Sequence, residues 1–187
     1  MDFGFQNGGS GGGSVPLTLN YGLFTQIDNS IPVVNTITET SLIGNGIGTL
    51  SVPENTFKIG DTFFLKMSGK ISSRNNDNLT IRLHANGNDI ATTGLMTMKN
   101  STKRNWELYA YFVIRQIGGL GIAFLATAGN FSYVADASTS FETYNYNTIT
   151  NVFDTTVINT LDVVCEWGQA DPLNSILSSQ TILTKLF

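Results

Sequence analysis

The chain has 187 residues, with a net charge of −4, 41% hydrophobic residues and only 13% charged residues. That length suits one domain, and the acidic balance (pI about 4.8) provides no field that would attract nucleic acid or a membrane surface. No run approaches the roughly 20 apolar residues that span a bilayer, and the acidic, then Gly-rich start does not resemble a signal peptide. We therefore expect no nucleic-acid partner and no membrane insertion.

The first 14 residues differ in composition from the rest of the chain. The stretch Gly8–Ser14 contains only Gly and Ser, which pack no core and form flexible linkers. It separates a short head, Met1–Gln6, from the remainder. We expect a flexible N-terminal tail over residues 1–14 and a single folded domain over residues 15–187; an engineered linker is the alternative origin of the Gly/Ser stretch.

Short strands are predicted at the start of the domain. Apolar residues alternate over Val15–Tyr21, and Ile31–Asn35 contains a proline that suits the start or edge of a strand. A glycine-dense loop follows over Ser41–Gly48. Thr49–Val52 then predicts another short strand, which ends before Pro53.

The centre of the chain predicts three consecutive strands. Apolar and polar residues alternate over Phe63–Ile71 and again over Leu79–Ala85, with the polar turn Ser72–Asp77 between them. The turn Asn86–Asp89 leads into a third strand over Ile90–Met98. Their order predicts a meander within one sheet.

Further strands are predicted after Met98. The polar loop Lys99–Asn105 carries the main local basic cluster and precedes a long strand from Trp106 to Arg115. Another strand covers about Leu120–Ala126, with a continuation near Phe131–Val134. The stretch Asp136–Asp154, rich in Ser, Thr, Asn and aromatics, suggests a long surface excursion.

Two clear strands close the chain, at about Val157–Trp167 and Ile176–Phe187. No segment has sustained helical periodicity. The whole pattern predicts an all-β jelly-roll β-sandwich of about eight to ten antiparallel strands. Trp106 and Trp167 are in phase with aliphatic neighbours on their strands, so we expect both to be buried.

The residues that usually carry chemistry are few and scattered. Cys165 alternates in phase with Val163 and Trp167, which indicates a buried structural thiol rather than a nucleophile. His84, the single histidine, lies within a strand and is expected to face solvent or a neighbouring strand. Carboxylates are dispersed singly, so we expect no metal site, no cofactor and no catalytic residue.

Two functional alternatives remain open. A hydrolase would need carboxylates that meet only in the fold, and the candidates are Glu107, Glu142 and Asp154. A carbohydrate-binding module would use exposed aromatics such as Tyr144 and Tyr146. Lys103 and Arg104 could contact an anionic glycan, although a solvated loop also explains them.

Several stretches of the chain carry a resemblance that covers about residues 21–187. These stretches are Gly22–Gln26, Glu39–Pro53, Phe57–Asp61, Asn78–Arg82, Trp106–Arg115, Asn174–Ile176 and Lys185–Phe187. They resemble motifs of virion structural proteins of tailed phages and large DNA viruses. The resemblance implies a capsid-associated fibre, spike or decoration protein on the outer capsid surface. It also implies a trimeric jelly roll similar to tumour necrosis factor and complement C1q, and it brings no catalytic residues.

Two features of the sequence predict protein partners: the second face of one long strand and the N-terminal tail. The second face of the strand that contains Tyr109, Tyr111 and Val113 is too aromatic for water alone, which favours a homotrimer. Phe3 and Phe5 point the same way in an extended tail, so we expect them to anchor the protein to the major capsid protein or another virion protein. The expected function is non-enzymatic and structural, with contact to a host surface glycan; the alternative is a receptor-binding, lectin-like domain.

Overall fold

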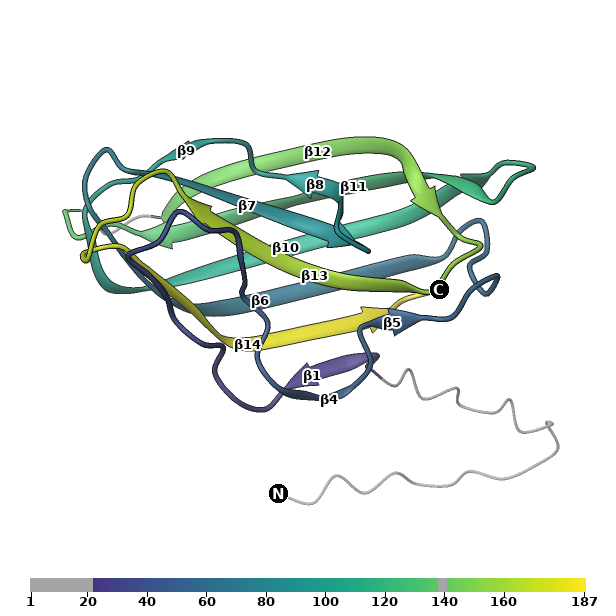
Figure 1. The fold of residues 1–187 in the computed structure, drawn as a ribbon, viewed down its shortest axis with the longest axis horizontal. Coiled ribbons are helices and arrows are strands. Elements are labelled where there is room, and N and C mark those ends of the chain that lie inside the picture. Colours follow the sequence, from purple (N-terminus) through teal and green to yellow (C-terminus); the bar gives the residue numbers. More distant parts are fainter. Residues whose placement is uncertain (1–21, 138–140) are drawn as a thin grey trace, which may run out of the picture.

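The computed structural model describes residues 22–137 and 141–187, which form a sandwich of two antiparallel β-sheets (Figure 1). The described residues contain fourteen strands, eight of them with five or more residues, so the predicted all-β sandwich is confirmed. The N-terminal tail over residues 1–14, with Phe3 and Phe5, and the predicted strand Val15–Tyr21 lie outside the described residues.

The larger sheet has eight strands, and Figure 1 shows β12 at its upper margin and β1 with β4 at its lower margin. In order across the sheet these are β12 (Phe141–Asp154), β11 (Ile122–Val134), β10 (Ser101–Ile117), β6 (Thr62–Ser73), β14 (Ser175–Lys185), β1 (Phe24–Gln26) and β4 (Gly46–Gly48), with β2 (Val33–Val34) paired to β14 beside this row. The centre of the sheet is therefore made by β10, β6 and β14.

The smaller sheet has six strands and packs against the inner face of the larger one. Its strands are β3 (Thr40–Ser41), β13 (Asn159–Trp167), β7 (Asn78–Ala85) and β8 (Asn88–Thr92) in order, with β5 (Ser51–Val52) paired to β13 and β9 (Met96–Thr97) paired to β7. Its longest pairing joins β7 to β13.

The alternating residues of the long strands build the core between the sheets. Leu65 and Met67 on β6 face Trp106 and other apolar residues of the interior, and Trp106 and Trp167 are both 0% exposed, as the sequence predicted. The indole N–H of Trp106 donates to the Leu177 carbonyl oxygen at 3.0 Å. Cys165 is fully buried on β13, and this burial raises the pKa of its thiol to about 12, which agrees with the predicted structural thiol.

The predicted three-stranded meander is wrong in its pairing. β6 and β7 are consecutive in the chain but belong to different sheets, because both edges of β6 are occupied by β10 and β14. Only β7 and β8 form the expected hairpin, and the third predicted strand is divided into β8 and β9. The turn Ser72–Asp77 therefore carries the chain across the sandwich.

Two predicted loops are strands. The expected surface excursion over Asp136–Asp154 contains β12, which pairs with β11 along its length, since the Phe, Tyr, Thr and Ile residues of this stretch favour a strand. The expected loop Lys99–Asn105 contains the first residues of β10. Val157, expected on the buried face of β13, precedes that strand and is exposed.

We expect Trp106→Ala and Trp167→Ala each to lower the free energy of unfolding by about 3–5 kcal/mol, because each removes a large side chain from a closed interior. Urea unfolding followed by circular dichroism measures the change. Leu120→Ala is the control, because this exposed side chain should change the value by less than about 0.5 kcal/mol. Loss of under 1 kcal/mol in both Trp variants would contradict the assigned strand phases.

Candidate functional site

The outer face of the larger sheet carries a cluster of aromatic side chains. Phe64 on β6 lies opposite Tyr111 on β10, and their ring centroids are 4.7 Å apart. Tyr109, two residues earlier on β10, stacks on Phe64 with centroids 6.2 Å apart and the planes inclined by 19°. The Lys66 ammonium lies 5.5 Å from the Tyr109 ring centroid. These rings cover one another in part, yet Tyr111 remains 48% exposed.

The cluster continues onto β11. Phe124 and Ile122 project from the same side of the sheet and are exposed. Ala128 lies opposite Tyr111 and Ala126 opposite Val113, so small side chains leave the edges of the larger ones uncovered. We call this surface the aromatic face, and its members are Phe64, Tyr109, Tyr111, Val113, Ile122 and Phe124. The outward orientation predicted for Tyr109, Tyr111 and Val113 is confirmed.

Most of the stretches that carry the resemblance supply buried polar contacts that hold strands together. In the first of them, Gln26 on β1 accepts hydrogen bonds through Oε1 from the Thr181 hydroxyl (2.6 Å) and the Gly44 N–H (3.1 Å). Its Nε2 donates to the Ser178 carbonyl oxygen at 3.2 Å. Gln26 thereby joins β1 to β14 and to the chain between β3 and β4.

Two further buried contacts follow the same pattern. Asp61, at the turn before β6, accepts the Lys58 N–H at 2.9 Å and forms an ion pair of 2.8 Å with Lys185 near the chain end. Asn174, before β14, is fully buried; its Nδ2 donates to Asp77 at 2.8 Å and its Oδ1 accepts the Arg74 N–H at 3.0 Å. These residues position strands and leave no reactive group free.

The single histidine belongs to a charged cluster on the outer side of the smaller sheet. His84 Nε2 lies 2.7 Å from Asp89 Oδ1 on β8, so the histidine faces a neighbouring strand. Arg82 Nη1 lies 2.7 Å from Glu39 and 2.8 Å from Glu166, and the hydrogen bond to Glu166 raises the pKa of the guanidinium. The pairs join β7 to β8, to β13 and to the residue preceding β3.

The aromatic pair expected to bind a glycan is not a surface platform. Tyr146 is 7% exposed and donates its hydroxyl to the Tyr109 carbonyl oxygen at 3.0 Å; burial raises the pKa of its phenol. Gly129 on β11 lies opposite Tyr146 and leaves room for this phenol. The hydroxyl of the half-buried Tyr144 donates to the Thr97 carbonyl oxygen at 2.7 Å. The expectation that Tyr146 is exposed is therefore wrong.

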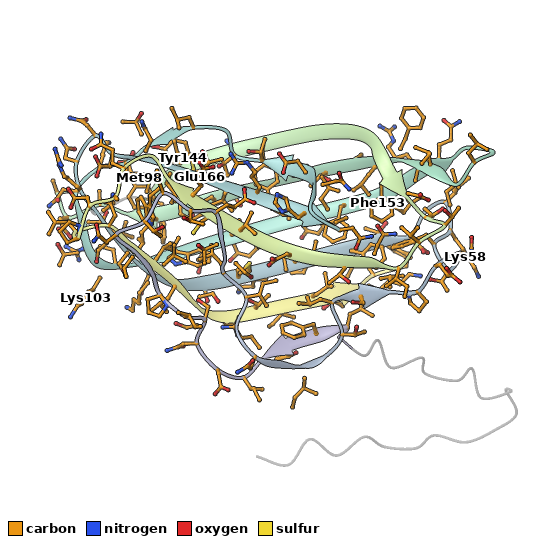
Figure 2. The ribbon with its side chains drawn as sticks, in the orientation of Figure 1. Lys58, Met98, Lys103, Tyr144, Phe153 and Glu166 are labelled. Carbon is orange, nitrogen blue, oxygen red and sulfur yellow. The ribbon has the colours of Figure 1, made fainter. Side chains whose placement is uncertain are left out.

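The two basic candidates differ in their surroundings. Arg104 Nε lies 2.7 Å from Asp136 Oδ1 in an ion pair, whereas Lys103 projects outward at the left end of the sandwich (Figure 2). The sequence did not single out Asp136, because its partners on β10 lie about 32 residues away and only pairing of the strands brings them together.

The carboxylates considered for a hydrolase are not brought together. Glu142 and Asp154 lie near opposite ends of β12, roughly 40 Å apart at the rise of an extended strand. Glu107 pairs with Ser132 and lies on the outer face of the larger sheet, whereas Glu142 pairs with Tyr133 and lies on its inner face. Glycosidases hold their two carboxyl groups within about 10 Å. This set therefore does not support glycoside hydrolysis.

We expect Gln26→Leu to lower the free energy of unfolding by about 3 kcal/mol, because each buried polar group that loses its partner costs about 1–3 kcal/mol. Chemical unfolding of both proteins measures the difference. Thr25→Val, an exposed change on the same strand, is the matched control and should stay within about 0.5 kcal/mol. Equal stability of the Gln26 variant and the parent would show that this contact does not hold β1 to β14.

Among the described residues, no group of three or more His, Cys, Asp or Glu side chains is arranged to hold a metal ion. The same part of the chain contains no helix with the length and hydropathy to cross a bilayer. Comparison with family models, with curated proteins and with solved structures finds no match.

Proposed function

We propose that this chain is a non-enzymatic structural protein of a virus particle, in which the sandwich forms an outward-facing trimeric head of fibre, spike or decoration type. The resemblance in the sequence suggests the class of protein. The observation that carries the proposal is the aromatic face, a partly exposed cluster on the outer face of the larger sheet. Contiguous exposed apolar patches on soluble domains mark interaction surfaces.

Further copies of this chain are the occupants that fit the aromatic face best. Aromatic side chains are enriched at protein interfaces, where they bury a large area with few rotatable bonds. Lys66 and Glu107 lie on the same outer surface as the rings, so both signs of charge are present for contacts between copies. A cyclic trimer closes when this face of each copy meets another surface of the next.

The buried polar contacts support a structural role for the chain. Gln26, Asp61 and Asn174 belong to three of the stretches that carry the resemblance, and each joins elements distant in sequence. Residues of this kind specify how strands are arranged. These contacts support the structural rather than chemical role that the resemblance implies.

We expect the intact chain to be a trimer of about 61 kDa, three times 20.3 kDa, in light scattering at micromolar concentration. Tyr111→Arg should shift it toward the monomer mass, because a charge at the centre of the aromatic face must lose its hydration on association. Ile37→Arg is the control: Ile37 is exposed between β2 and β3, away from this face, and its variant should stay trimeric. A monomeric parent protein would reject the proposal.

We expect residues 1–14 to attach the head to the particle. Phe3 and Phe5 are separated by one residue, so their side chains would point the same way in an extended conformation, and a seven-residue Gly/Ser linker would reach about 15 Å. A tail from each of three copies would bind together, so weak single contacts give stable attachment. The measurement is binding to particles assembled without the protein, using chains that lack residues 1–14 or carry Phe3→Ser and Phe5→Ser. Undiminished attachment of these folded trimers would place the docking surface on the sandwich.

A further inference from the structure

A groove of about 630 Å³ opens at the end of the sandwich where β6 ends and β10 begins. The turn before β14 forms its other wall. Cavities that bind small ligands occupy about 300–1,000 Å³, so this volume is sufficient for one or two sugar rings. The residues used below are Lys70, Ser72, Lys103, Leu173 and Ser175.

The groove is bordered by a bulge in β10 that orients Lys103. The register between β10 and β6 shifts between Ser101 and Arg104. Within the bulge Lys103 has a φ of 51°, in the left-handed region that residues other than glycine seldom adopt, and its N–H donates to the Ser72 hydroxyl at 3.0 Å. Bulges of this kind redirect a side chain from the sheet, and Lys103 is one of the residues that line the groove.

Asp136 stabilises this bulge from the neighbouring segment. Its carboxylate accepts the Thr102 N–H at 3.0 Å, the Thr102 hydroxyl at 2.8 Å and the Arg104 Nε–H at 2.7 Å. The hydrogen bond from Arg104 lowers the pKa of Asp136, so the carboxylate remains ionised at neutral pH. The unusual backbone at Lys103 is thus held by four hydrogen bonds, including the one to Ser72.

Two lysines leave a positive charge in the groove. At this end of the sandwich three cations form ion pairs within the described residues: Arg74 with Asp171, Lys99 with Glu142, and Arg104 with Asp136. No ion pair in the described part of the chain includes Lys70 or Lys103. The Lys70 ammonium donates to the neutral Asn105 side chain instead, at 2.6 Å. A chain of net charge −4 therefore presents a local site for an anion.

We propose that this groove binds an acidic saccharide, with the carboxylate or sulfate of the sugar between Lys70 and Lys103. The remaining lining suits the rest of a sugar: the hydroxyls of Ser72 and Ser175 hydrogen-bond ring hydroxyls, and the exposed Leu173 packs on a C–H face. Charge-assisted hydrogen bonds from the ammonium groups select acidic over neutral sugars. The proposal is independent of the particle role and of trimer formation.

The test is isothermal titration of the full chain with sialyllactose, an oligogalacturonate and a heparin-derived tetrasaccharide, with lactose as the neutral comparison. At least one acidic sugar should bind at millimolar concentration or below, and lactose should not. Raising the salt concentration should weaken the binding, because ions screen the two lysines. Absence of binding by every acidic sugar, or equal binding of lactose, overturns the proposal.

Variants then locate the site. Lys70→Ala and Lys103→Ala should each weaken the acidic sugar about tenfold or more, and Leu173→Glu should abolish binding by placing a carboxylate in the groove. Lys58→Ala is the control, because Lys58 lies at the opposite end of the sandwich and also forms no ion pair in the described residues (Figure 2). Circular dichroism checks that each variant is folded. Unchanged affinity in the folded Lys103 variant overturns the proposed site. If a poly-glutamate peptide binds as tightly as the acidic sugars, the proposal that the ligand is a saccharide is overturned.

Discussion

The larger sheet depends on the position of its last strand, β14, which pairs with two strands from the first half of the chain. β14 lies between β6 and β1, so the first and last strands of the described residues are hydrogen-bonded neighbours. Gln26 contacts Ser178 across 152 positions of sequence, and Lys185 pairs with Asp61 at the entrance to β6. Because such distant segments must meet before their contacts form, we expect the fold to assemble slowly and as one unit.

The same central strands carry both surfaces for which binding is proposed. β6 and β10 pair over eleven positions. Their outer faces carry Phe64, Tyr109 and Tyr111 toward the start of β6, and Lys70 and Lys103 line the groove toward its end. Their inner faces lie in the closed core. The pair of strands therefore carries both the proposed self-association surface and the proposed ligand groove.

The polar groups in the interior connect strands, whereas Lys103 on the surface is proposed to bind a ligand. Gln26, Asp61 and Asn174 are buried and each makes several hydrogen bonds, which removes the cost of leaving a polar group unpaired. Lys103 lies outside this interior: its N–H donates to the Ser72 hydroxyl, and the residue is exposed and lines the groove. The interior polar groups are thus paired within the protein, whereas Lys70 and Lys103 form no ion pair in the described part of the chain.

Period-two alternation was sufficient to predict the class of fold and the buried faces. Leu65, Met67, Trp106 and Trp167 are inside because a strand with one apolar face must cover it, whichever strands are its neighbours. The same alternation identified Tyr109 and Tyr111 as outward-facing. Local sequence therefore determined what these strands bury and what they expose.

Only the tertiary structure decided which strands are neighbours, since alternation carries no information about the partner along either edge. β6 and β7 separate into different sheets for this reason, and Phe64 reaches Tyr111 only through the register of β6 with β10. Tyr146 is buried because β12 places it opposite Gly129. The bulge at Lys103 depends on Asp136, whose partner Thr102 lies 34 positions away in sequence, so the groove exists only when the sheet has formed.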